Sequence, residues 1–176
     1  MTERAIDTMF RISSSNQMRL SKMADRKAHI MITVNAIILS AVISLLLRKL
    51  DTNSFLMIPA FLLLVSSVGA IIFAVLATRP VIHKGSVSKK DMDEKKVNLL
   101  FFGNFYRMPL ADYRESMMKM MDNLEYVYGS LVTDGYFQGV VLGKKYRLLR
   151  ISYNVFMFGL IISVIAFIFA SAFYIK

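Results

Sequence analysis

Three long apolar runs constrain this chain more than any other feature of its sequence. Ile30–Leu47 holds 18 residues without a charged side chain, Phe55–Ala77 holds 23, and Ile151–Ile175 holds 25. At about 1.5 Å per helical residue these runs reach roughly 27–37 Å, which matches a hydrocarbon core about 30 Å thick. Buried helices of a soluble bundle are rarely apolar all round over such lengths. The sequence therefore predicts an all-α integral membrane protein with three transmembrane helices.

The residue types that most enzymes need are scarce. The 176 residues include no cysteine, which excludes disulfides, thiolate metal sites and cysteine catalysis. The two histidines, His29 and His83, fall at a predicted membrane boundary and in a polar linker. The sequence also has no glycine-rich phosphate loop, metal-spaced cluster or nucleophile elbow. We therefore expect the protein not to be an enzyme and to require neither a metal nor a cofactor.

The runs divide the chain into four segments. Residues 1–29 are predicted to form a cytosolic amphipathic helix that lies on the bilayer surface or acts as a gating lever on the first span. Residues 30–77 form a transmembrane hairpin, with spans at 30–47 and 55–77, and Pro80 ends the second span. Residues 78–150 form a helical cytosolic sensor and assembly region that opens with a polar linker, His83–Lys96, and residues 151–175 form the third span.

The distribution of lysine and arginine sets the expected orientation. Of the 22 basic residues, nineteen lie in residues 1–29 and 78–150, and three lie in the hairpin loop and at the C-terminus. Cytosolic segments carry the excess of Lys and Arg. The N-terminus and residues 78–150 are therefore predicted to be cytosolic, and the C-terminus to lie on the opposite side of the membrane.

Hydroxyl and amide side chains interrupt the first span. Thr33, Ser40 and Ser44 share one helical face, with Asn35 beside it. Such small polar residues allow close helix packing in lipid, or they line a pore that the apolar Ile38 can constrict. Three helices enclose no water path, so a pore would need several copies around an axis. No Asp, Glu, Lys, Arg or His lies within a span, which argues against a proton relay.

Basic residues also gather immediately before the third span. Lys144, Lys145, Arg147 and Arg150 are either topology signals that contact anionic lipid, or a nucleotide site that acts directly on that span. Four further basic residues in residues 78–150 are weaker candidates for the same ligand: Arg107, Arg114, Lys89 and Lys90.

A methionine-rich stretch, Met117–Met121, lies in a region with helical apolar spacing. Such a stripe is typical of core packing, or of an adaptable contact surface. The second interpretation allows an alternative function, a non-conducting membrane adaptor that recruits a soluble signalling enzyme.

Several stretches together resemble a known family, the transmembrane effector domain of the Pycsar anti-phage systems (PycTM-like). The similarity covers residues 18–169. It is carried by the stretches Met23–Ala28, Phe73–Pro80, Asn98–Phe105 (NLLFFGNF) and Leu142–Arg150 (LGKKYRLLR). The last two of these are the more specific.

The resemblance implies an anti-phage defence effector that compromises the inner membrane and arrests growth. Its expected partners are the lipid bilayer, further copies of itself in a homo-oligomer, with a tetramer as the expected size, and a nucleotide signal. A neighbouring nucleotidyltransferase or cyclase would make that signal, either a cyclic nucleotide or an oligonucleotide. Several relatives carry a fused cyclic-nucleotide-binding domain that this sequence does not show, so residues 78–150 or a partner protein would act as the sensor.

Overall fold

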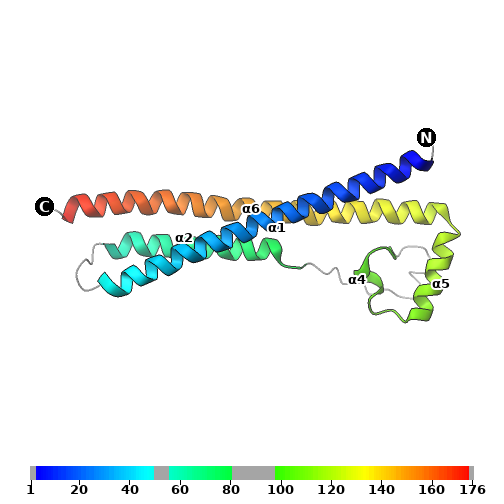
Figure 1. Cartoon of the computed structure of the whole chain (residues 1–176), viewed down its shortest axis with the longest axis horizontal. Helices are drawn as coiled ribbons and strands as arrows, with labels where there is room; N and C mark the ends of the chain where they lie inside the picture. The colour runs from blue at the N-terminus through cyan, green and yellow to red at the C-terminus, as the bar shows by residue number, and fades with distance from the viewer. Residues whose placement is uncertain (1–2, 50–55, 81–97, 175–176) are drawn as a thin grey trace. The chain divides into compact units, whose positions relative to one another are not determined.

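A computed structural model describes residues 3–49, 56–80 and 98–174 of the chain (Figure 1). The hairpin loop at 50–55 and the whole of the linker His83–Lys96, with Lys89 and Lys90, lie outside the described residues. Every regular element of the described part is a helix. The helices are α1 (Glu3–Lys49), α2 (Met57–Thr78), α4 (Phe102–Phe105), α5 (Leu110–Met121) and α6 (Leu124–Tyr174).

Three of these helices, α1, α2 and α6, are long and apolar enough to cross a membrane. This confirms the predicted fold class. The 22 residues of α2 span about 33 Å at 1.5 Å per residue, enough for the hydrocarbon core. In α1 the predicted amphipathic segment and the first span form one helix of 47 residues, because neither proline nor glycine interrupts it.

The chain divides into two compact units. The membrane unit comprises the described parts of residues 21–79 and 143–176, and the α5 unit comprises those of residues 1–20 and 80–142. Helices α1 and α6 each contribute residues to both units.

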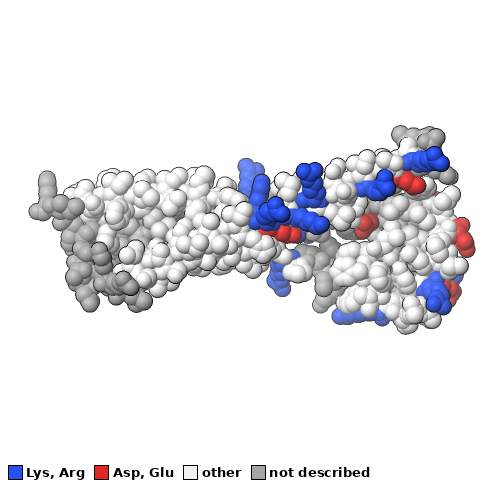
Figure 2. Space-filling model, viewed as in Figure 1, with Lys and Arg blue, Asp and Glu red and all other residues white. Residues whose placement is uncertain are grey.

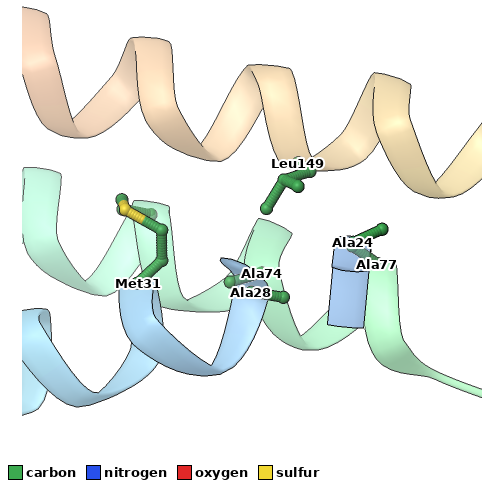
Figure 3. Packing of buried hydrophobic residues seen from close by; sticks show 7 residues of the cluster. Ala24, Ala28, Met31, Ala74, Ala77 and Leu149 are labelled. Atoms are coloured by element: carbon green, nitrogen blue, oxygen red, sulfur yellow. The ribbon is translucent and has the colours of Figure 1, made fainter. Parts of the chain in front are cut away.

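Small side chains form the core of the membrane unit. Ala24, Ala28 and Met31 of α1 pack with Ala74 and other buried residues of α2, and α6 adds Leu149 (Figure 3). The large apolar side chains of the same helices point outward, as Ile37, Phe61 and Phe167 do. Lipid tails are as apolar as leucine, so large apolar residues need no burial there, and small residues let the helices approach closely.

On the face drawn in Figure 2, the described charged side chains of the membrane unit gather at one end of it. On the face drawn, the described surface over the apolar parts of α1, α2 and α6 shows no charge. A surface of this kind is compatible with lipid over the length of a bilayer core.

The α5 unit is held by larger apolar side chains. Leu99, Met120 and Tyr126 are buried together, and Met117 and Val127 pack against them. Helix α6 begins at Leu124 because the Asn123 side chain accepts a hydrogen bond from the backbone N–H of Tyr126, at 3.0 Å.

Candidate functional site

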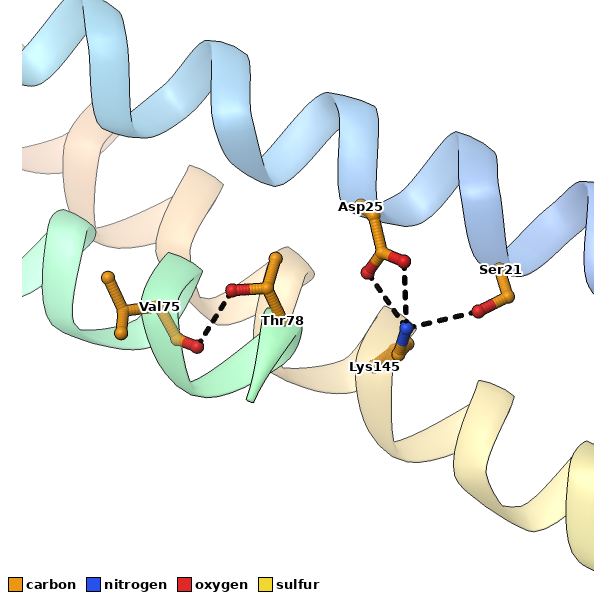
Figure 4. A network of polar contacts seen from close by, with 5 residues as sticks. All are labelled: Ser21, Asp25, Val75, Thr78 and Lys145. Carbon is orange, nitrogen blue, oxygen red and sulfur yellow. Dashed lines mark hydrogen bonds and ion pairs between the residues drawn. The ribbon is translucent and has the colours of Figure 1, made fainter. Parts of the chain in front are cut away.

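A polar network joins α1 to α6 within the membrane unit (Figure 4). The Lys145 Nζ donates to both carboxylate oxygens of Asp25, at 2.8 and 2.9 Å, and to the Ser21 Oγ at 3.0 Å. The Lys145 side chain is 17% exposed and the Asp25 side chain 36%. The two oxygens of one carboxylate lie too close together to accept different hydrogens of the ammonium group, so they share one hydrogen, and the Ser21 Oγ accepts a second. In this conformation the charge of Lys145 is therefore paired with Asp25, and an anion would have to compete with that carboxylate.

The other basic residues of this segment point to the surface. Lys144, Arg147 and Arg150 are exposed on α6. Asp25 is the one acidic residue in the described part of the membrane unit, and Lys145 already holds it. Four more exposed basic residues belong to the same unit: Lys22, Arg26, Lys27 and Arg79. We name the seven exposed residues, Lys22, Arg26, Lys27, Arg79, Lys144, Arg147 and Arg150, the basic band.

The basic band has the chemistry of an anion site. Guanidinium groups bind phosphate through paired N–H donors, and ammonium groups add point charge. The structure thus separates the four basic residues that the sequence grouped before the third span. Three are exposed, and the fourth, Lys145, is tied to α1.

Arg107 and Arg114 belong to the α5 unit and are exposed. The Arg107 guanidinium lies over the Tyr106 ring, 5.1 Å from its centroid, in a cation–π contact. The NLLFFGNF stretch builds the neighbouring turn, where the Leu100 N–H donates to the Asn98 side chain and the Asn104 amide donates to the Asn98 carbonyl.

The candidate gate residues of the first span differ in exposure. Thr33, Ser40 and Ser44 are exposed on α1, and Ile38 is half-buried. Asn35 is fully buried within the packing of a single chain. The hydroxyl-bearing face is therefore available to another molecule, whereas Asn35 is not in this conformation.

Two serines of α6 connect that helix to α2. The Ser152 Oγ donates to the Ala70 carbonyl at 2.7 Å, and the Ser163 Oγ donates to the Pro59 carbonyl at 2.8 Å. Gly159 lies between them in sequence, and a Cβ there would collide with Ser66 of α2. These contacts hold α6 against α2 between Pro59 and Ala70.

Sequence reasoning missed Asp25 and Ser152. A signal existed for Asp25, because it is the only acidic residue between Arg19 and Lys27, a stretch with four basic residues. Ser152 had no such signal, because its position within an apolar run does not show which helix it meets.

A comparison with protein families matches residues 8–171 to the Pycsar effector protein domain (PycTM). The chain belongs to the Pycsar effector family. The match covers both units, so the α5 unit is part of the family domain and not an appended module. As a Pycsar effector, the protein is a membrane-spanning anti-phage defence effector. No curated protein and no solved structure matches the chain.

Proposed function

We propose that this Pycsar effector is a homo-oligomeric channel, tetrameric in its simplest form, that a nucleotide signal gates to compromise the inner membrane and arrest growth. The proposed signal is a cyclic nucleotide or an oligonucleotide made by a neighbouring cyclase or nucleotidyltransferase. The proposed orientation places the N-terminus and the α5 unit in the cytosol and the C-terminus outside. It follows from the basic residues, nineteen of which lie in residues 1–29 and 78–150, because cytosolic segments carry the excess of Lys and Arg.

One observation carries the channel proposal. Thr33, Ser40 and Ser44 are exposed on α1 although they lie in an apolar span. Hydroxyl groups gain little from lipid tails, whereas they suit a water-filled pore or a contact with another copy. The interior of one membrane unit is filled by closely packed small side chains, so the proposed pore lies between copies.

The proposed ligand site is the basic band. Lys144, Arg147 and Arg150 would bind the phosphate groups, and Lys145 would join them when it releases Asp25. A ligand that binds the released state better than the paired state shifts the population toward it. Because Lys145 lies on the helix that contains the third span, ligand binding would act on that span directly. The protein is proposed to perform no chemical reaction of its own.

Liposome flux tests the proposal. Purified protein in liposomes should release a trapped dye or ion when the cognate nucleotide is added to the side of the α5 unit. A variant with Lys144, Lys145 and Arg147 replaced by alanine should assemble normally and lose the nucleotide response. Absence of flux at every nucleotide tested would reject the channel, and an unchanged response in the variant would reject the site.

An adaptor that recruits a soluble signalling enzyme is the second candidate. Met118 and Met121 of α5 are 55% and 58% exposed, although Met120 between them is buried. Exposed methionines suit an adaptable protein contact. An adaptor would carry no flux, and replacement of Met118 and Met121 by glutamate would abolish defence without altering the membrane unit.

A further inference from the structure

The fully buried side chains of the membrane unit include three polar ones, Asn35, Ser67 and Ser152, one from each helix. Each has an exposed fraction of 0%. Ser152 is satisfied, because its hydroxyl donates to the Ala70 carbonyl. Asn35 uses only part of its hydrogen-bonding capacity, and the Ser67 hydroxyl uses none of it. Among the described residues, neither the Asn35 Oδ1 nor the Ser67 Oγ has a hydrogen-bond partner.

The orientation of the Asn35 amide follows from its one hydrogen bond. The Asn35 Nδ2 donates to the Met31 carbonyl at 2.9 Å. A carbonyl oxygen only accepts, so the nitrogen must face Met31 and the Oδ1 must point away from it. An amide flip would leave two acceptors facing each other and would not satisfy the Oδ1.

Ser67 lacks the usual solution for a serine in a membrane helix. Such a hydroxyl commonly donates to a carbonyl one turn earlier in its own helix. For Ser67 the carbonyls one turn earlier are those of Leu63, which already accepts the neighbouring Ser66 hydroxyl at 3.0 Å, and Leu64; the Ser67 Oγ bonds to neither. The Ser67 Oγ therefore keeps both its hydrogen and its lone pairs.

The helix pairing brings these two side chains to the same level. Figure 3 shows Ala24 and Ala77 at one level of the α1–α2 contact and Ala28 and Ala74 at the next, with Met31 following. A step of four residues forward in α1, from Ala24 to Ala28, matches a step of three residues backward in α2, from Ala77 to Ala74. Seven further residues along each helix, two turns, lead from Ala28 to Asn35 and from Ala74 to Ser67. One turn beyond Met31, the same register sets Asn35 opposite Ser67.

We propose that Asn35 and Ser67 bind a water molecule between α1 and α2. The water donates one hydrogen to the Asn35 Oδ1 and forms its second hydrogen bond with the Ser67 Oγ. Buried waters occur where a polar site offers two or more partners, and both partners here are shielded from bulk solvent and lipid. The bridge would be a polar contact between α1 and α2, whether or not the protein conducts.

Radiolytic hydroxyl-radical labelling with mass spectrometry detects such a water, because radicals form from the bound water itself and modify its neighbours. The probe is Met31, 4% exposed and one helical turn from Asn35. The full-length protein in lipid nanodiscs should show Met31 oxidised despite its burial. The label should fall to background in Ser67→Ala and in Asn35→Leu, and both variants should unfold at a lower temperature than the wild type.

Ser152→Ala is the matched control, since it removes a direct bond between α6 and α2 at an equally buried serine. This variant should lower the unfolding temperature and keep the label on Met31. An unlabelled Met31 in the wild type would overturn the proposal. So would a label that persists in Ser67→Ala, or an unfolding temperature that rises in Ser67→Ala, because a rise would mean that the hydroxyl is unsatisfied.

Discussion

The interiors of the two units of this Pycsar effector are packed in opposite ways. The α5 unit buries large apolar side chains, with Leu99 at its centre, as a soluble protein does. The membrane unit buries alanines and polar side chains, and it turns its large apolar residues outward. The hydrophobic effect stabilises the α5 unit, because burying a leucine removes it from water. In lipid that driving force is absent, so close packing and hydrogen bonds stabilise the membrane unit.

The largest loss of stability is expected for a substitution of Leu99, which is fully buried in the α5 unit. Leu99→Ala leaves a cavity in the core and should destabilise the α5 unit by about 3 kcal/mol. Hydrogen exchange resolved by peptide should show faster exchange in α5 and in the first turns of α6, with residues 151–174 unchanged.

Leu100 supplies the control, because it is 39% exposed beside Leu99. Leu100→Ala should change stability by less than about 0.5 kcal/mol. Equal effects of the two variants would mean that the α5 unit has no apolar core of the soluble kind.

The second prediction contrasts two glycines of α6. Gly159→Ala brings a Cβ into Ser66, so the helices must separate, and it should cost about 1–3 kcal/mol. Gly139→Ala meets open space and should raise helix stability by about 1 kcal/mol. Thermal unfolding in detergent, followed by circular dichroism, compares the two. A stabilising alanine at 159 would show that α2 and α6 are not in close contact there.

The third prediction concerns the link between α1 and α6. Asp25→Asn removes the charge that holds Lys145 and should lower the stability of the membrane unit by about 1 kcal/mol, the upper end for exposed pairs. It also frees Lys145 to bind phosphate. Nucleotide-induced flux from liposomes should therefore reach half its maximum at a lower nucleotide concentration than in the wild type. A higher concentration would indicate that Asp25 itself supports the ligand.

The smallest effect is expected at the pair formed by Glu115 and Lys119 in α5. The two charged atoms are 2.9 Å apart, and the side chains are 67% and 59% exposed. Solvent and salt screen such a pair, so Glu115→Gln should cost about 0.3 kcal/mol and leave flux unchanged. Unfolding at low and high salt measures this loss of stability. A loss as large as that of Asp25→Asn would mean that the two ion pairs do not differ in strength.

The candidate site was predicted in part. The clustering of Lys144, Lys145 and Arg147 could be seen in the sequence, because adjacent basic residues before an apolar run are conspicuous. The pairing of Lys145 with Asp25 could not, since the two residues are separated by 120 positions. The burial of Asn35 could not be predicted either. Helical spacing places Asn35 beside the hydroxyl-bearing face of α1, but it does not show which side of α1 contacts α2.

The sequence by itself determined that the chain crosses a membrane three times and belongs to the Pycsar effectors. Length, apolar composition and charge placement act locally along the chain, so they can be read residue by residue. Only the tertiary structure decided which polar residues turn inward, which of four neighbouring cations is tied to α1, and where helices touch too closely for a Cβ. Those properties depend on the rotation and register of one helix against another, which the spacing of residues within a single helix does not contain.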